Sequence, residues 1–446
     1  MPVLFSFLFR PAALLLSLAV LLLAGCEQAQ GVRQVLRPLT PHAQYTQALS
    51  EAGLQETELG RQWTQAGEEA LTRAMSTALP YREVGYFDPA DPSAVGYRMD
   101  VRRGQRLLAE VKTEASDSLR LFIDLFRLSA DSSQVPEHIA YADTMGTLDV
   151  EAERDATYLL RLQPELLRGG RFTLTIQGDA SLAFPVSGVH TEAIHSIFGD
   201  PRDGGRRDHH GVDIFAPRGT PVVASVDGIV TRVRDGGRGG KTVWLRDLRR
   251  GLALYYAHLD TQFVRAPLRV QKGDTLGLVG NTGNARTTPP HLHFGVYGGG
   301  PLDPYPFLHV DPPTDVTADT SRLGLWARVR SQRANLRGGP NTTFAIRQAL
   351  PRHTALRVLG GSGGWYRVAL PDGASGFIAS NLTEPTTRPI RQVAQDADVS
   401  LRYRPTRLAA AIDSVAAGTS VPVLARFDDF VYVEAPDGRA GWMVSD

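Results

Sequence analysis

The spacing of apolar residues changes several times along the chain, and each change marks a different kind of element. Between residues 41 and 85, apolar side chains such as Leu49, Trp63 and Leu71 recur near the helical period. This spacing predicts one or two amphipathic helices. We therefore assign residues 41–85 to a helical segment.

Residues 86–184 switch to alternation of apolar and polar positions. The alternation is clear in three stretches, 97–101, 119–125 and 172–176. Several short strands of this kind, separated by glycine and aspartate turns, predict a β-sandwich. No residue in the stretch marks a reaction, so we expect an accessory unit that acts as a spacer or in binding.

An internal repeat fills the C-terminal part of the chain. With a shift of 65 residues, Asn-Leu-Arg at 335–337 aligns with Ser-Leu-Arg at 400–402, and the glycine–aromatic pair at 376–377 aligns with the one at 441–442. The register holds without a gap over the whole length of the copy. Such a repeat predicts two tandem modules of one fold.

Each copy has the size of a small β-barrel, which places the barrels at residues 323–385 and 390–446. The stretches NLRGGP, GGWYRV and PDGASGF resemble bacterial SH3-like domains, a resemblance that implies binding to the cell wall. Trp365, Tyr366 and Trp442 are the candidate wall-binding aromatic residues. The alternative, which we favour, is that such aromatic residues form the barrel core.

The N-terminus has the features of a secretory leader. Arg10 precedes an apolar run at 11–23 that is too short to span a bilayer comfortably, and the sequence Leu-Ala-Gly-Cys follows it. Residues 1–26 resemble the signal peptide of bacterial lipoproteins, which implies lipidation of Cys26. The alternative is an ordinary secretory signal. Residues 27–40 are polar, as expected of a tether.

Composition and charge narrow the fold and the partners. A chain of 446 residues is expected to form three to five modules. Its 44 glycines and its scarcity of helix-favouring runs suit short strands joined by turns, so we predict a mainly β, multidomain protein. The formal net charge is +1 and no block of one sign occurs, so nothing favours nucleic acid as a partner. The one cysteine, if lipidated, excludes disulfides in the mature chain.

Five residues from three separated segments carry the candidate chemistry. They are His209 and Asp213 in HHGVD, His258 in YYAHL, and His291 and His293 in PHLHF. Four of them are histidines, in a chain that has 11. Imidazole and carboxylate together are ligands for a transition metal.

The local spacing brings several of these side chains together. His291 and His293 are two apart in a strand-like run, so they share one face of the strand. The glycine in HHGVD permits a bend that lets the histidine and Asp213 converge. With one histidine of the strand they form a set of three ligands, which in a zinc site leaves a fourth position open for water. The absence of further cysteines agrees with a catalytic site of this kind.

The order and separation of HHGVDIFAPRGTPV, YYAHL, GNTGN and PHLHFGVY resemble the LytM/lysostaphin family of zinc metallopeptidases. The resemblance covers residues 185–311 and implies a β-rich peptidase domain with one zinc ion. GNTGN itself is expected to form a turn between strands, because no helical pattern or lysine follows it as in a phosphate-binding loop. Gly295 and the segment 288–290 depart from the family pattern, which leaves the fit of the substrate open.

By that resemblance His209, Asp213 and His293 would be the metal ligands. His258 and His291 would act on water and the transition state without binding the metal. Their ordinary pKa of about 6.5 suits proton transfer, and either can instead donate a hydrogen bond to an oxyanion. The sequence does not divide these two roles between them.

His210 adjoins His209 and is also able to reach a metal. The family pattern places the ligand four residues before the aspartate, which is Asp213, and so favours His209. We therefore expect His210 to line the site or to face solvent.

The resemblance implies a zinc-dependent endopeptidase that hydrolyses peptide bonds in peptidoglycan. With the lipid anchor at Cys26 and the two barrels, the expected location is the bacterial cell envelope, on the periplasmic or outer face of a membrane. The expected partners are the peptide part of peptidoglycan and the membrane. The alternative is a catalytically silent scaffold that activates a wall amidase, although members of that class commonly lose metal ligands.

Overall fold

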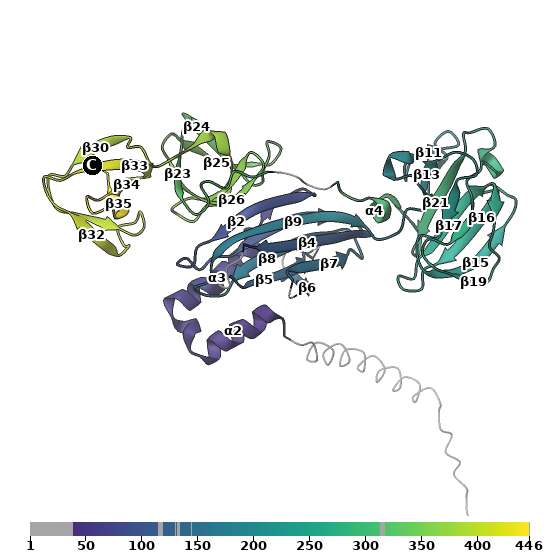
Figure 1. Cartoon of the computed structure of the whole chain (residues 1–446), viewed down its shortest axis with the longest axis horizontal. Coiled ribbons are helices and arrows are strands. Elements are labelled where there is room, and N and C mark those ends of the chain that lie inside the picture. Colours follow the sequence, from purple (N-terminus) through teal and green to yellow (C-terminus); the bar gives the residue numbers. More distant parts are fainter. Residues whose placement is uncertain are drawn as a thin grey trace, which may run out of the picture. The chain divides into compact units, whose positions relative to one another are not determined.

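The computed structural model describes residues 39–114, 119–129, 131, 134–143, 145–312 and 317–445. The predicted signal peptide, Cys26 and most of the tether lie outside these residues. Within them, no helix is both long and apolar enough to span a bilayer. The chain divides into two compact units, Met1–Gly60 and Arg61–Asp446. The described part is mainly β and contains several sheets, as predicted (Figure 1).

The N-terminal segment begins with three helical elements: α2 (Pro41–Glu51), the 3-10 helix η1 (Leu54–Glu56) and α3 (Glu58–Thr72). Thr40 caps α2, since its Oγ1 accepts the N–H of Ala43 at 3.1 Å. Trp63 in α3 is 1% exposed, and its Nε1–H donates to the carbonyl of Pro164 at 2.7 Å. This contact fixes α3 to the strands that follow it.

The end of the segment predicted to be helical forms strands instead. Here the chain folds into β1 (Met75–Ser76) and β2 (Tyr81–Phe87). Residues of β2 alternate between buried and half-buried positions, which is the period of a strand and not of a helix. The prediction extended the helical period of the preceding residues past Thr72, where it no longer holds.

Two sheets form the sandwich. The first has the order β1-β3-β8-β5-β6, with β3 (Val95–Val101), β8 (Ala156–Pro164), β5 (Leu121–Arg127) and β6 (Glu137–Tyr141). The second runs β2-β9-β4-β7, with β9 (Gly170–Ala180), β4 (Gln105–Thr113) and β7 (Thr147–Glu151) (Figure 1). Both sheets contribute to one core, in which Tyr97 and Leu125 of the first meet Phe172 and Leu174 of the second.

The two barrels show the 65-residue repeat strand by strand. The first contains β23 (Trp326–Val329), β24 (Arg333–Arg337), β25 (Ile346–Pro351), β26 (Ala355–Ser362), β27 (Trp365–Ala369), β28 (Ser375–Ala379), η4 (Ser380–Leu382) and β29 (Thr383–Pro385). The second contains β30 (Arg391–Ala394), β31 (Val399–Arg402), β32 (Ala411–Val415), β33 (Ser420–Phe427), β34 (Phe430–Glu434) and β35 (Ala440–Val444). Strands β26, β27 and β28 begin 65 residues before β33, β34 and β35 respectively.

The sandwich and the first barrel share one sheet. Strand β2 pairs with β26 in antiparallel register, with Val84 opposite Gly361. Nine strands from the two modules thus follow one another in one continuous sheet, which runs β25-β24-β28-β27-β26-β2-β9-β4-β7. Next to this junction, the buried carboxylate of Glu83 accepts a hydrogen bond from Nε of Arg367 at 2.7 Å. A Cβ atom on Gly360 would lie 2.2 Å from Oε1 of Glu83, so the close approach of the strands needs glycine there.

Residues 185–311, here called the central region, hold the candidate site on an eight-stranded sheet. Its order is β10-β13-β21-β17-β16-β15-β19, with β10 (Ile194–Ser196), β13 (Val212–Phe215), β21 (His291–Tyr297), β17 (Ala253–Leu259), β16 (Lys241–Arg246), β15 (Gly228–Arg234) and β19 (Leu268–Val270), and β22 (Pro301–Leu302) pairs with β21. The smaller elements are β11 (Pro201–Arg202), β12 (Arg207–Asp208), β14 (Pro221–Val223), β18 (Thr261–Gln262), β20 (Thr275–Leu278), η2 (Thr191–Ala193), η3 (Gly283–Ala285) and α4 (Tyr305–Leu308).

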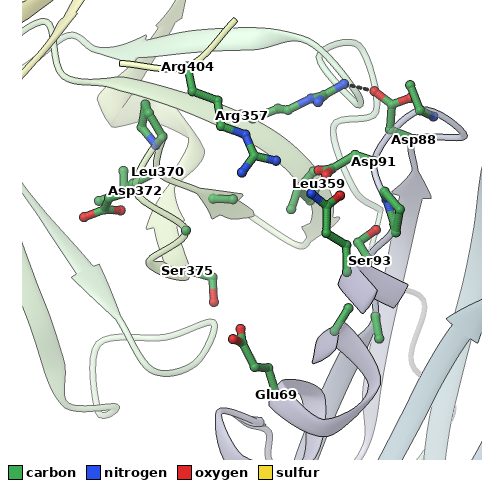
Figure 2. A pocket seen from close by; sticks show the side chains of 18 of the residues that line it. Glu69, Asp88, Asp91, Ser93, Arg357, Leu359, Leu370, Asp372, Ser375 and Arg404 are labelled. Atoms are coloured by element: carbon green, nitrogen blue, oxygen red, sulfur yellow. Dashed lines mark hydrogen bonds and ion pairs between the residues drawn. The ribbon is translucent and has the colours of Figure 1, made fainter. Parts of the chain in front are cut away.

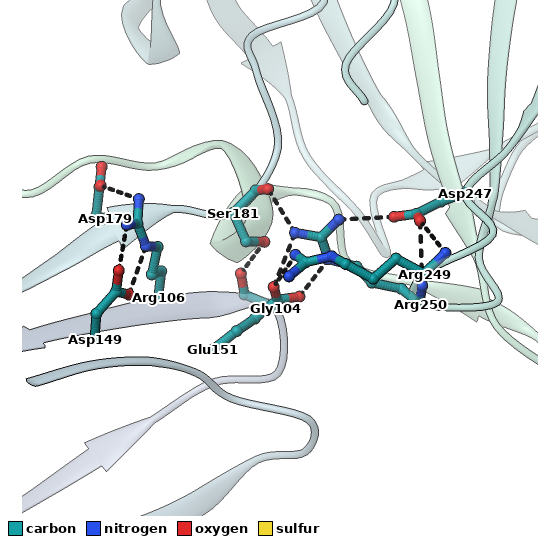
Figure 3. Close-up of polar contacts among 9 residues, drawn as sticks. All are labelled: Gly104, Arg106, Asp149, Glu151, Asp179, Ser181, Asp247, Arg249 and Arg250. Atoms are coloured by element: carbon teal, nitrogen blue, oxygen red, sulfur yellow. Dashed lines mark hydrogen bonds and ion pairs between the residues drawn. The ribbon is translucent and has the colours of Figure 1, made fainter. Parts of the chain in front are cut away.

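Ion pairs join the central region to the sandwich. Figure 3 shows Arg250, in the turn after β16, with its Nε donating to Glu151 of β7 at 2.6 Å and its Nη1 donating to Asp247 at 2.7 Å. Arg250 also donates to the carbonyl of Ser181 at 2.9 Å. The guanidinium of Arg250 thus connects the central region, the sandwich and the chain segment that joins them.

Candidate metal centre

Strand register places the side chains of Asp213 in β13 and His293 in β21 on one face of the sheet. Asp213 lies opposite His293 in the pairing of β13 with β21, and Ala257, next to His258, lies opposite His293 in the pairing of β17 with β21. Leu292 points to the other face, where it is fully buried in the core. The alternation of β21 therefore separates a polar face from an apolar one, as the sequence predicts.

Three of the predicted residues bring their donor atoms to one point. Nε2 of His209 is 3.1 Å from Oδ1 of Asp213 and 2.9 Å from Nδ1 of His293, and Nδ1 of His293 is 3.0 Å from the same carboxylate oxygen. These side chains form the group that can hold a metal ion among the described residues. Two ligands bound tetrahedrally to one zinc ion lie roughly 3.4 Å apart, close to the separations here.

The hydrogen bonds around His209 argue for a cation between these atoms. Nδ1 of His209 is 2.8 Å from the carbonyl of Ile197, which only accepts, so the ring proton is on Nδ1. In the neutral form that binds a metal, Nε2 of this ring would turn a lone pair toward Asp213 and His293. A proton on Nδ1 of His293 can be donated to Nε2 of His209 or to Oδ1 of Asp213, but not to both. A metal ion would bind the lone pairs of all three atoms.

Charge in the cluster favours the ionised carboxylate. Burial raises the pKa of Asp213, but hydrogen bonds from His209 and His293 outweigh it and hold the pKa well below its ordinary value. Burial lowers the pKa of His293, which favours the neutral imidazole. Anionic carboxylate and neutral imidazole are the forms that bind a metal.

Arg202 in β11 supports the cluster, although no motif in the sequence indicated it. Its Nη2 donates to Oδ2 of Asp213 at 2.8 Å and also contacts the hydroxyl of Ser196. With Oδ2 held by Arg202, Oδ1 is the oxygen that faces His209 and His293. Contacts of this kind orient a metal ligand from behind.

His258 and His291 lie beside the cluster with matching hydrogen bonds. Nδ1–H of His258 donates to the carbonyl of Thr282, and Nδ1–H of His291 donates to the carbonyl of Pro289, both at 2.9 Å. The ring centroids of the two residues are 5.1 Å apart, and that of His258 is 6.0 Å from the ring of His293. In each ring Nε2 remains to exchange a proton or to form a hydrogen bond with a ligand.

The position of His258 carries backbone strain and a lowered side-chain pKa. Its φ of 62° lies in the left-handed region, which is costly for a residue other than glycine and recurs at functional sites. Burial, with help from nearby His291 and His293, lowers the pKa of His258 to about 4. The carbonyl of Thr282 comes from the GNTGN stretch, which forms a turn between β20 and β21 and holds this ring.

His210 does not join the cluster. Its side chain is exposed, and its ring lies 6.4 Å from that of Phe198. The glycine between His209 and the aspartate is required by space, since a Cβ atom on Gly211 would lie 2.7 Å from the ring of His293. Gly295 is similarly confined, because its Cβ atom would lie 2.9 Å from the ring of Tyr297.

The predicted wall-binding aromatic residues lie mainly inside the barrels. Tyr366 is fully buried and Trp442 is 1% exposed, and both belong to one apolar cluster shared by the two barrels. Trp365 is partly buried and packs against the core of the sandwich. This burial agrees with the favoured core alternative, and it leaves the rings of Tyr366 and Trp442 without a surface for stacking on a ligand.

Comparison with known proteins places this site in a family. Residues 207–304 match Peptidase family M23, and this range contains all five candidate site residues. The chain carries an M23 peptidase domain. Residues 332–384, in the first barrel, match the bacterial SH3 domain.

The M23 domain accounts for the similarity to individual proteins. The L-Ala–D-Glu endopeptidase of Bacillus subtilis is 35% identical over 139 residues, which are 28% of this chain and 42% of the relative. The DD-carboxypeptidase/endopeptidase Mpg of Neisseria meningitidis is 38% identical over 141 residues, or 30% of this chain and 31% of the relative. The chain thus spans less than half the length of these curated relatives.

Among solved structures, the catalytic domain of lysostaphin from Staphylococcus simulans matches at 31% identity. The match covers 25% of this chain and 88% of that domain, with a TM-score of 0.23.

Proposed function

We propose that this chain is a zinc-dependent endopeptidase that hydrolyses peptide bonds in peptidoglycan. The observation that carries the proposal is the convergence of three donor atoms, from His209, Asp213 and His293, beside two imidazoles with available Nε2 atoms. The match to family M23 supports it, as do the names of the relatives, which are endopeptidases acting on bonds between alanine and glutamate or between D-residues.

The donor set fits zinc. Two imidazole nitrogens and one carboxylate oxygen make a three-ligand site of the catalytic kind, in which a fourth position stays open to water or substrate. Asp213 offers a single oxygen, because Arg202 holds the other. We assign His209, Asp213 and His293 as the ligands of one zinc ion per M23 domain.

The remaining histidines serve the reaction around this ion. Zinc would polarise the scissile carbonyl and lower the pKa of water toward about 7. His258 and His291 hold their rings in one tautomer through backbone carbonyls, so each presents Nε2 to the reacting groups. One ring accepts a proton from water at Nε2, and the other, when it also carries a proton on Nε2, donates a hydrogen bond to the oxyanion. Substitution of each separately assigns these roles.

The predicted lipidation motif and the SH3-like barrels support a proposal for the location of the reaction. Lipidation at Cys26 would hold the protein on the periplasmic or outer face of a membrane, in the bacterial cell envelope. A polar tether at residues 27–40 would let the M23 domain reach the wall, and the SH3-like barrels would retain it there. The partners are then the peptide part of peptidoglycan and the membrane.

Release of muropeptides from purified peptidoglycan tests the function. The full chain in mild detergent is incubated with the wall, with and without a chelator, and the products are analysed for new amino termini by mass spectrometry. We expect soluble fragments whose termini identify the bond, and we expect chelator or His293→Ala to abolish them. His190→Ala, which changes an exposed histidine of the same domain, serves as the matched control and should keep activity.

Failure of the zinc-loaded wild-type chain to release fragments would overturn the proposal. It would favour the scaffold alternative, in which the domain activates a wall amidase. That alternative makes its own prediction, because His293→Ala would then still stimulate the amidase.

A further inference from the structure

A second cavity lies at the junction of α3, the loop after β2 and the two barrels. Its volume is about 680 Å³, within the range of roughly 300–1,000 Å³ that small-ligand sites occupy. None of the five residues of the M23 site lines it. Figure 2 shows charged side chains from several elements around it, among them Asp91, Arg357 and Arg404.

Aromatic rings form one wall of this cavity. The ring centroid of Trp326 lies 5.4 Å from that of Tyr432 and 5.7 Å from that of Trp442, and the last two are 5.1 Å apart. Trp442 is buried behind the other two, which are half-buried. Trp326 and Tyr432 therefore offer aromatic surface to the aliphatic part of a ligand.

Positive charge next to this aromatic wall is only partly neutralised, and Arg357 is the strand partner of Trp326. Arg357 forms an ion pair with Asp88, yet its Nε–H is buried and finds no hydrogen-bond partner among the described residues. Arg404 forms no side-chain hydrogen bond or ion pair with any described residue, and its guanidinium lies over the ring of Tyr403 at 5.7 Å. In Figure 2 it extends into the cavity toward Asp91. Because Nε of Arg357 is enclosed by protein, the accessible unused donors are those of Arg404, and a guanidinium of this kind suits a carboxylate.

Asp91 supplies the opposite charge. Its carboxylate is half-buried and accepts no hydrogen bond from the described part of the chain. Burial raises the pKa of Asp91, while Arg357 and Arg404 act against the rise. A half-buried carboxylate without a donor is costly to maintain, and an ammonium group placed beside it would relieve the cost.

We propose that this cavity binds a short peptide that carries both a free carboxylate and a free amino group. Arg404 takes the carboxylate, Asp91 takes the ammonium group, and Trp326 and Tyr432 contact the rest of the peptide. Resting on the proposed function, the ligand is an uncrosslinked stem peptide of peptidoglycan, in which the side chain of the diamino residue is a free amine and the C-terminus is a free carboxylate. The cavity would hold wall peptide at a place separate from the M23 site.

Isothermal titration tests the proposal with a defined probe, the free tripeptide L-Ala–γ-D-Glu–L-Lys. The protein is the full chain with His293→Ala, so that the probe is not cleaved and the result does not depend on catalysis. We expect saturable binding at one site, weakened about ten-fold by Arg404→Gln and about ten-fold by Asp91→Asn, because each removes a charged hydrogen bond. Arg407→Gln, in the same exposed loop but outside the cavity, should leave the dissociation constant unchanged.

A second probe separates the two ends of the ligand. Amidation of the tripeptide's carboxylates should weaken binding to the chain and remove the effect of Arg404→Gln, while Asp91→Asn should still weaken binding. The proposal is overturned if the tripeptide does not bind, or if it binds equally to the Arg404→Gln, Asp91→Asn and Arg407→Gln variants. Loss of wall digestion leaves these outcomes unaffected, so failure of the two proposals can be told apart.

Discussion

Oδ1 of Asp213 lies 3.0 Å from Nδ1 of His293, and the two residues are direct partners in the pairing of β13 with β21. The contact is built by strand register, and the backbone of both residues is fixed by the sheet. The third donor, Nε2 of His209, comes from the segment just before β13. Two of the three candidate metal ligands are thus held in place by the backbone of the sheet.

Arg202 should control the affinity of the site for zinc. Because its Nη2 holds Oδ2 of Asp213, Arg202→Gln should lower zinc affinity by about 10- to 100-fold, the range found when a contact behind a metal ligand is lost. Competition with a chromophoric chelator measures the affinity without relying on activity. Arg206→Gln is the control, since the Arg206 side chain is exposed and contacts the carbonyl of Asp203. Equal zinc affinity in both variants would refute this role.

His258 and His291 should affect turnover and leave zinc binding nearly unchanged. Neither side chain contacts the three donor atoms by a hydrogen bond, and each presents Nε2 to the reacting groups. Alanine at either position should lower kcat by about 100-fold or more, as expected on removal of a proton-transfer or oxyanion group. Zinc content by atomic emission should stay at the wild-type level. A variant that lost its zinc would instead identify the substituted histidine as a ligand.

The buried pair between Glu83 and Arg367 should stabilise the junction of the sandwich with the first barrel. Glu83 is fully buried and Arg367 is 5% exposed, so Arg367→Met leaves a buried carboxylate without its cation. We expect a loss of about 3–5 kcal/mol in the free energy of unfolding, measured by urea titration. The additional change Glu83→Leu should recover much of this loss, since it removes the unpaired charge.

An exposed pair gives the matched comparison. Arg439 contacts Asp413 at 2.7 Å but is largely exposed, so Arg439→Gln should leave stability nearly unchanged. If Arg439→Gln were as destabilising as Arg367→Met, burial would not be the source of the effect.

Gly360 should be intolerant of a side chain. A Cβ atom there would lie 2.2 Å from Oε1 of Glu83, whereas nothing lies within 4 Å of a Cβ atom on Gly364. Gly360→Ala should therefore cost about 1–3 kcal/mol through overpacking, and Gly364→Ala should be close to neutral. Urea unfolding of the two variants side by side measures the difference. Equal stability would mean that β2 and β26 do not pair in solution.

The sequence predicted the features that depend on local spacing. His291 and His293 share a face because they are two apart in a strand, and His209 and Asp213 converge across Gly211, so the cluster could be inferred without a structure. The 65-residue repeat likewise predicted that the two barrels have corresponding strands, because it can be read from the spacing of residues alone. Lipidation of Cys26 stays a prediction, since that residue lies outside the described part of the chain.

Features that depend on distant pairing could not be predicted. Arg202 reaches Asp213 only through the β11–β12 hairpin, and the pairing of Val84 with Gly361 joins two modules that the sequence presents as separate. The helical prediction failed past Thr72. Strand β2 is too short for its alternation of buried and half-buried residues to stand out after the helical spacing of the preceding residues. The strands that pair with β2, which are β9 and β26, lie far away in the sequence.

Zinc add-back to the chelator-treated full chain tests the central claim most directly. Muropeptide release and bound zinc are measured in the same samples as zinc is added. We predict that release rises in proportion to bound zinc, saturates at one ion per chain, and stays at background in His293→Ala at every concentration. Full release by the metal-free chain, or zinc-dependent release by His293→Ala equal to that of the wild type, would contradict the account.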